Sequence, residues 1–303
     1  MGLPADSDDV ILDELVALAK RRPDRLQQFV NLTAARQYRP LYRLFRRYVP
    51  AGAEVLDWGA GNGHFSYFLS RAGYHVTGFS FEGFDFQDWL RDPGYRFIAG
   101  DPSEPTTLPF ATASFEAIAS VGVLEHVREM GGDEGASLRE IGRCLRPGGV
   151  FICYHLPNRA SLIDAVARRI LGKPHHAYRY IRADIEILAR GAFLDILEVH
   201  RYGILPRNSC RRMPRPLREA RIMANAWDAL DEGLRPLLSP FCQNYLFIAR
   251  KRRGPGPSGL RMHCASVTTS ASHPHLSKAT LSRFLPHLRR FAGGGRRSES
   301  TLC

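Results

Sequence analysis

The chain of 303 residues lacks several features that would fix its class at once. Its six cysteines include no C-x-x-C pair, so they predict neither a zinc site nor a disulfide framework. Long apolar runs and a charged-then-apolar leader are also missing, which predicts a protein without a membrane span. We therefore expect reduced thiols and a cytoplasmic location. With no carboxylate cage either, we expect no metal.

Acidic residues are scarce at the C-terminal end. Ten Lys or Arg and one acid, Glu299, lie between residues 251 and 303, so residues 1–250 carry only +3 of the total net charge of +12. The Gly-Pro and Ser/Thr clusters here are typical of disorder. We predict a disordered basic tail at 252–303, with a short amphipathic helix at 278–291 as its one ordered piece. Either it is an arm that binds nucleic acid or an anionic surface, or it is a non-functional extension. We prefer the second, because no aromatic residues are interleaved with the charges.

The loop at residues 57–63 lacks the residues of two common phosphate-binding motifs. A dinucleotide fingerprint needs glycine at position 64, which is His, and a P-loop needs G-K-[ST], which is absent. Present instead are a strand-like run that ends in Asp57, glycines at 59, 61 and 63, and a helical pattern after them. Glycines at alternate positions let a ligand lie against a strand-to-helix turn. The pattern predicts a nucleotide-type cofactor loop, and a tight turn without cofactor is the alternative.

Further motifs follow the loop in a recognisable order. They are Gly100-Asp101 after a third strand, Leu108-Pro109-Phe110 and Ser114-Phe115-Glu116 before a fourth, Leu124-Glu125-His126 after it, and Leu145-Arg146-Pro147-Gly148-Gly149 before a fifth. With the glycine loop, this series resembles the class I S-adenosylmethionine-dependent methyltransferases over about residues 30–250. It comes closest to the small-molecule branch that includes ubiquinone-biosynthesis-type enzymes.

The resemblance implies an α/β fold. We expect a Rossmann-like, doubly wound, seven-stranded and mostly parallel sheet with an antiparallel last strand, in three α/β/α layers. We expect an N-terminal helical extension at 1–30 and a methyltransferase domain at 31–251. Within that domain we expect a helix at 33–48, a lid over the acceptor site at 156–180 and a Pro- and Arg-rich insert at 205–240.

Matching the family's motif positions assigns the cofactor contacts. We expect S-adenosylmethionine to be bound by Asp57, Gly59, Ala60, Gly61, Gly63, Ser80, Glu82, Asp101, Pro102, Val121 and Gly122. Asp57 would meet the ammonium side and Asp101 the adenine amino group. A helix cap and a turn are the respective alternatives for these two acids. The family's ribose-binding acid is replaced by Ser80, with Glu82 nearby. Tyr38 and Arg39 are weaker candidates for the methionine carboxylate.

The chemistry is expected to be methyl transfer to a small molecule, with oxygen as the acceptor atom. An oxygen nucleophile needs a base, and His126, His155 and His176 are the candidates, although each more often has a structural role. Two alternatives stand beside this reading. One is an RNA methyltransferase, supported by the basic tail and by the arginines of the insert. The other is a non-catalytic module that binds S-adenosylmethionine. We expect no specific nucleic acid partner, and the sequence does not indicate an oligomeric state.

Overall fold

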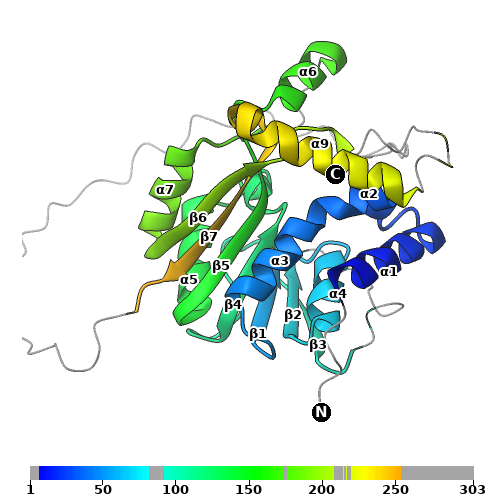
Figure 1. Ribbon diagram of the computed structural model, residues 1–303. Coiled ribbons are helices and arrows are strands. Elements are labelled where there is room, and N and C mark those ends of the chain that lie inside the picture. Colours follow the sequence, from blue (N-terminus) through cyan, green and yellow to red (C-terminus); the bar gives the residue numbers. More distant parts are fainter. Residues whose placement is uncertain are drawn as a thin grey trace, which may run out of the picture. The chain divides into compact units, whose positions relative to one another are not determined.

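A computed structural model gives the fold, and it describes residues 7–81, 90, 92–172, 176–207, 214, 216 and 220–253. Its central sheet has seven strands in the order β3-β2-β1-β4-β5-β7-β6 (Figure 1). They are β1 (Glu54–Trp58), β2 (His75–Ser80), β3 (Tyr95–Ala99), β4 (Phe115–Val121), β5 (Leu145–Pro157), β6 (Leu194–Tyr202) and β7 (Asn244–Lys251). Strands β1 to β5 pair in parallel, and β7 is antiparallel to both β5 and β6. The expected Rossmann-like sheet with an antiparallel last strand is confirmed.

Helices cover both faces of this sheet. The described helices are α1 (Asp8–Arg21), α2 (Leu32–Ala35), α3 (Arg39–Tyr48), α4 (His64–Arg71), α5 (Glu134–Cys144), α6 (Leu162–Leu171), α7 (Arg182–Gly191) and α9 (Arg221–Leu238). The described 3-10 turns are η1 (Gln27–Phe29), η2 (Arg36–Tyr38), η3 (Leu124–His126) and η5 (Ser239–Phe241). Among the described residues, no helix has both the length and the hydropathy that a bilayer crossing requires.

The core is divided between the two faces of the sheet. Adjacent residues of one strand point to opposite faces, so Val55 packs with α1, α3 and α4 while Leu56 packs with α5 and α7. The same division applies to Ile152 and Phe151 of β5. Two fully buried layers therefore hold the sheet, and its carboxyl edge is left to the loops that follow β1, β2, β4 and β5.

The segment 33–48, predicted as one helix, is helical throughout but is interrupted by a 3-10 turn. Helix α2 ends at Ala35, the 3-10 turn η2 follows, and α3 begins at Arg39 with Pro40 in its first turn. Proline fits the first turn of a helix but blocks the hydrogen bond that would continue a preceding one. Tyr38 ends the 3-10 turn, and its side chain lies in the core, where it is 5% exposed.

Helix α9 fills the second half of the Pro- and Arg-rich insert expected at 205–240. Its Asp228 forms ion pairs with Arg36 of η2 at 3.4 Å and with Arg39 of α3 at 3.5 Å, and also with Arg207 at 2.5 Å. These arginines are thus neutralised by an acid rather than left to solvent. The arginines at 211, 212, 215 and 218 lie outside the described residues, as do Glu82 and residues 254–303 of the predicted tail.

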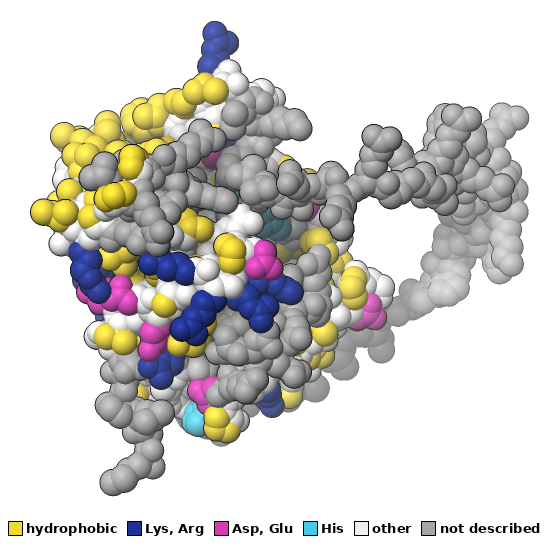
Figure 2. Space-filling model, turned by 90° about the vertical axis from the view of Figure 1, so that its right-hand side faces the viewer, with side chains coloured by type: hydrophobic (Ala, Val, Ile, Leu, Met, Phe, Trp, Pro, Cys, Tyr) yellow, Lys and Arg dark blue, Asp and Glu magenta, His cyan; other side chains and the backbone are white. Residues whose placement is uncertain are grey.

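Helices α6 and α9 carry exposed hydrophobic side chains. Ile170 of α6 is 73% exposed, and Ile222 and Leu237 of α9 are 78% and 80% exposed. In Figure 2, hydrophobic side chains gather over the upper part of the face shown, whereas basic and acidic side chains are intermixed below them.

The segment 156–180, predicted as a lid, begins with the last residues of β5 and includes helix α6.

Candidate active site at the carboxyl edge of the sheet

The glycine loop joins β1 to α4 and is fastened to the neighbouring strand. The backbone N–H groups of Gly59 and Ala60 both donate to the carbonyl of Phe79 in β2, at 2.8 and 2.9 Å. Gly59, Gly61 and Gly63 have φ values of +78°, +50° and +73°, which residues with a Cβ rarely adopt. Gly63 is the N-cap of α4, so the first N–H groups of that helix lie at the loop.

Gly59 and Gly61 of this loop have different surroundings. A Cβ on Gly59 would lie 2.3 Å from Cγ2 of Val123, so this glycine is required by packing against the loop after β4. A Cβ on Gly61 would meet only the carbonyl oxygen of Gly59, at 3.7 Å. The clearance that a ligand needs is therefore present at Gly61. Such an open side beside a helix N-terminus fits the polar part of a nucleoside-type cofactor.

Asp57 lies beneath this loop and is 1% exposed. Its carboxylate accepts a hydrogen bond from Ser66 Oγ at 2.6 Å and another from the Ser66 backbone N–H. Burial raises the pKa of Asp57 to about 6, and the Ser66 hydrogen bonds oppose the rise. These contacts match the alternative reading of a cap for the next helix. The predicted contact with the cofactor's ammonium group stays a prediction.

The predicted ribose and adenine positions lie after β2 and β3. Ser80 is the last residue of β2, and its carbonyl accepts from the N–H of Gly100 at 2.9 Å. Asp101 accepts from both the N–H and the hydroxyl of Ser103, at 2.8 and 2.7 Å, and these bonds lower its pKa. Asp101 and the following Pro102 are exposed. Asp101 therefore stabilises a turn, and its carboxylate remains open to solvent at the edge of the sheet.

Val121 and Gly122 end β4 at the centre of the carboxyl edge. Gly122 has a φ of +70°, and its N–H donates to the carbonyl of Tyr154 at 2.9 Å. A Cβ here would lie 3.8 Å from Glu125 Oε1 and 3.9 Å from the Cβ of His155. Gly122 thus brings the turn η3 and the end of β5 together. Ligands of open parallel sheets bind at such carboxyl edges.

The environment of His155 argues against its predicted role as the base. Its Nδ1 is hydrogen-bonded to the hydroxyl of Tyr202 at 2.9 Å, and its backbone N–H donates to the same oxygen at 2.9 Å. Its φ of +66° is unusual for a residue with a side chain. Burial lowers its pKa to about 3, so the ring is neutral and a weak base near pH 7. These are the contacts of a structural histidine.

A Tyr202→Phe substitution tests this interpretation. It removes the one hydroxyl that serves two groups of His155, and it leaves a buried N–H without a partner. We expect the free energy of unfolding to fall by about 1–3 kcal/mol, measured by urea denaturation. Tyr48→Phe, which removes a hydroxyl bonded to Glu198 near the surface, is the control and should cost less. Equal losses in both variants would contradict a structural role for the His155 pair.

Tyr38 connects His155 to the glycine loop. Its ring centroid lies 4.8 Å from that of His64 and 5.2 Å from that of His155. Tyr38 is thus beside the loop, as expected of a cofactor contact. Arg39, its predicted companion, instead pairs with Asp9 and Asp228.

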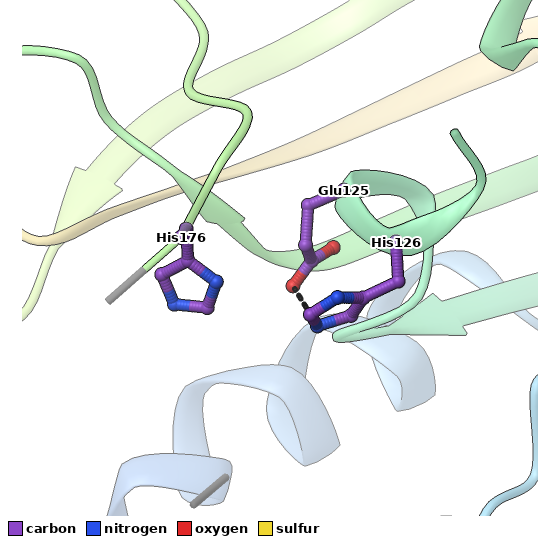
Figure 3. A group of neighbouring side chains, drawn as sticks. All are labelled: Glu125, His126 and His176. Carbon is purple, nitrogen blue, oxygen red and sulfur yellow. Dashed lines mark ion pairs between the residues drawn. The ribbon is translucent and has the colours of Figure 1, made fainter. Parts of the chain in front are cut away.

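The other two predicted catalytic histidines lie side by side. The rings of His126 and His176 are 5.9 Å apart, and Glu125 joins them, with one ligand-type atom from each of the three within 4.8 Å of the others (Figure 3). Glu125 is 3% exposed, and burial raises its pKa to about 7. Glu125 was expected only as part of a motif after the fourth strand, with no role of its own. Its position in the Leu124-Glu125-His126 motif was the available signal.

The structure also has a cavity of about 280 Å³ that was not predicted. It is lined by Arg128, Glu134, Arg159, Tyr178, Arg179, Tyr180, Asp184, Ile187 and Leu188. The guanidinium of Arg128 lies 4.9 Å from the ring centroid of Tyr178. Arg128 and Tyr178 each stand two residues after a histidine of the cluster, so the cluster and the cavity share both chain segments. We call this cavity the Arg-Tyr cavity.

Comparisons with known proteins indicate the kind of domain. Residues 56–153 match a family model described as a methyltransferase domain. Two curated proteins named tRNA U34 carboxymethyltransferase are similar. One, from Geobacter sp. (strain M21), is 32% identical over 167 residues, which cover 50% of this chain and 49% of that protein. The other, from Trichlorobacter lovleyi, is 34% identical over 111 residues, which cover 34% and 32%. The chain spans about half the length of the first relative and a third of the second.

A solved structure confirms the fold alone. In the complex between the Haloferax volcanii Trm112 methyltransferase activator and the putative methyltransferase, the matched chain is 18% identical, with a TM-score of 0.51. The match covers 80% of this chain and 98% of that chain. The relatives named above correct one expectation, because they are tRNA-modifying enzymes by name and not members of a ubiquinone-biosynthesis branch.

Proposed function

Since residues 56–153 form an S-adenosylmethionine-dependent methyltransferase domain, we propose that this chain binds S-adenosylmethionine at the glycine loop and modifies an RNA acceptor, with tRNA as the first substrate to test. The observation that carries the acceptor class is the similarity to two relatives named for tRNA U34 modification. This proposal replaces the expected small-molecule acceptor with what had been the alternative.

The donor side of the proposed site uses the loop and the helix behind it. S-adenosylmethionine supplies a methyl group that its sulfonium sulfur already activates. The chain therefore has to hold the donor in line with the acceptor, and positioning is the main catalytic device. Gly61 offers the backbone clearance, Gly63 presents the N-terminus of α4, and Asp57 contributes its carboxylate.

On the acceptor side, the Arg-Tyr cavity has the chemistry of a nucleotide site. Arginine side chains pair with phosphate, and aromatic rings stack on bases. Three arginines and two tyrosines line the cavity. Arg128 is held by an ion pair with the buried carboxylate of Glu134, at 2.6 Å, and Glu134 also accepts from the hydroxyl of Tyr180 at 2.8 Å. This network keeps Tyr178 and Tyr180 close to the cluster of His126 and His176.

The decisive experiment incubates the full chain with S-adenosylmethionine labelled in its methyl group and with total bacterial tRNA, followed by mass analysis of the nucleosides. We expect label in one nucleoside, with a mass gain of one methyl group, because S-adenosylmethionine supplies no carboxyl carbon. A Gly61→Val variant should lose the label. Labelling of small-molecule extracts but not of RNA would overturn the acceptor class, and binding of the donor without any labelling would favour a non-catalytic module.

Two arginines of the Arg-Tyr cavity give a quantitative test. Arg159→Gln and Arg179→Gln should each weaken RNA binding and reduce by about 1 the slope of log affinity against log salt concentration. Arg182→Gln is the matched control, because Arg182 is exposed on α7, pairs with Glu186 at 2.8 Å and does not line the cavity. Filter binding at several salt concentrations measures the slope. An equal effect of all three substitutions would reject the cavity as the acceptor site.

A further inference from the structure

The cluster of Glu125, His126 and His176 combines donor types that bind metal ions. Glu125 and His126 come from η3 after β4, and His176 comes from the segment after α6. In Figure 3 the Glu125 carboxylate lies between the two imidazole rings. Two imidazole nitrogens and one carboxylate oxygen are the ligands of many catalytic zinc and iron sites, which keep further positions open for a substrate.

The hydrogen bonds around His126 favour such an ion. Its Nδ1 lies 2.8 Å from Glu129 Oε2, so in the neutral ring Nδ1 carries the proton and Nε2 carries the lone pair. That nitrogen lies 4.0 Å from Glu125 Oε1, so the two atoms face each other within the cluster. A histidine whose second nitrogen donates to a carboxylate is the usual arrangement of a metal ligand.

A second, independent observation concerns the other oxygen of Glu125. This carboxylate is 3% exposed, and its Oε2 has no hydrogen-bond partner among the residues that the structure describes. A buried carboxylate oxygen without a partner is costly, so a cation beside it would offset the cost.

We propose that Glu125, His126 and His176 form a binding site for a divalent d-block ion of the Zn²⁺ type. Ligand atoms about 2.1 Å from a tetrahedral ion lie about 3.4 Å apart. The three donor atoms lie within 4.8 Å of one another. To reach a separation of about 3.4 Å they would have to approach by at most about 1.4 Å. His126 and His176 are partly exposed, and their side chains can turn by this amount.

The place of this site gives it a role beside the acceptor. It adjoins Gly122 at the carboxyl edge and shares both chain segments with the Arg-Tyr cavity. A divalent ion there supplies positive charge to an oxygen of the acceptor and makes that oxygen easier to deprotonate. This role rests on the proposed function, whereas the binding of the ion does not.

The sequence predicted no metal, because no zinc spacing is present. The third ligand, His176, is brought to Glu125 and His126 only by the return of the chain after α6. The competing explanation is a protonated His126 that pairs with both Glu125 and Glu129. The two explanations differ in one respect, since an imidazolium has no lone pair for an ion.

Calorimetric titration of the full chain with ZnCl₂ tests the proposal. The protein is first stripped with a chelator, and neither S-adenosylmethionine nor RNA is added. We expect one site that is lost in His126→Ala and in His176→Ala, and weakened at least tenfold in Glu125→Gln. Glu129→Gln should weaken binding about tenfold through the orientation of His126. The control is His200→Ala, because His200 also has a carboxylate partner, Glu198 at 2.8 Å, but lies exposed on β6.

A visible absorption spectrum with CoCl₂ in place of ZnCl₂ tests the same site in a second way. It detects the ligands of the bound ion directly and does not depend on the stability of the variant. Bands of nitrogen- and oxygen-bound Co²⁺ should appear in the parent chain and in His200→Ala, and should be absent from His176→Ala. His176 is partly exposed, so this variant is expected to fold, which its far-UV circular dichroism checks. Binding that is unchanged in both His126→Ala and His176→Ala, or no binding in the parent chain, would overturn the metal site. The RNA proposal would stand in either case.

Discussion

The Gly59→Ala variant is expected to lose binding of S-adenosylmethionine and to become about 2–5 kcal/mol less stable. Two effects add up. The φ of +78° costs a residue with a Cβ about 1–2 kcal/mol, and the new Cβ would lie 2.3 Å from Cγ2 of Val123, an overpacking worth about 1–3 kcal/mol. Relief of the clash must displace either the glycine loop or the turn after β4. Urea denaturation and calorimetry with S-adenosylmethionine measure the two losses.

Two control variants separate the backbone strain of the positive φ from the steric clash with Val123. Gly52 has nearly the same φ, +75°, and a Cβ added there would have no atom within 4 Å, so Gly52→Ala should show the strain alone. Val123→Ala removes the two methyl groups that the new Cβ would meet, and the double variant should recover part of the lost stability. A double variant with simply additive losses would show that Val123 is not the obstacle.

The Asp57→Asn variant is expected to be more stable than the parent above pH 7 and to bind S-adenosylmethionine more weakly. Burial raises the pKa of Asp57 from 3.8 to about 6, which corresponds to about 3 kcal/mol at neutral pH. Asparagine has nearly the same shape, and its Oδ1 can still accept the hydrogen bond from Ser66. Asparagine is uncharged, so its burial carries no penalty for desolvating a charge.

The sign of the pH effect follows from the direction of the pKa change. The folded chain keeps a proton on Asp57 between pH 3.8 and about 6, where the unfolded chain has released it. The stability from this group is therefore complete below pH 3.8 and is lost as the pH rises through 6. The stability difference between variant and parent should grow from near zero at pH 4 to about 3 kcal/mol at pH 8.

Binding of the donor completes this test. If the Asp57 carboxylate meets the ammonium group, its loss removes a charge-assisted hydrogen bond and should weaken affinity roughly tenfold or more. A more stable variant with unchanged affinity would assign Asp57 to the capping of α4 alone. Ser66→Ala, which removes a neutral partner of the same carboxylate, is the control.

Much of the fold could be predicted because it depends on local patterns. The strand that contains Asp57, the glycines after it and the motif at 145–149, which begins β5, each have a spacing that only a few structures satisfy. The expected helix at 33–48 was found with a 3-10 turn inside it, and helical periodicity alone does not show where such a turn falls. Tyr38 at the end of that turn packs beside the rings of His64 and His155.

The candidate site was less predictable, since its parts meet only through the fold. Nothing in the sequence brings His176 to Glu125, or Tyr202 to His155. The three candidate histidines look alike in the sequence, but burial makes His155 a weak base, whereas His126 and His176 lie beside a buried carboxylate. Whether a histidine can exchange a proton or bind an ion depends on its neighbours across the sheet edge. No motif records them.

The convergence of arginines on Asp228 also has a consequence for the order in which this chain acquires its structure. Arg36 is 6% exposed, and its charge is balanced by an acid on α9, almost at the end of the described chain. During synthesis the N-terminal helices leave the ribosome before α9, so the ion pair between Arg36 and Asp228 cannot form until α9 has been translated. The packing around Arg36 is therefore completed only when translation has passed residue 238.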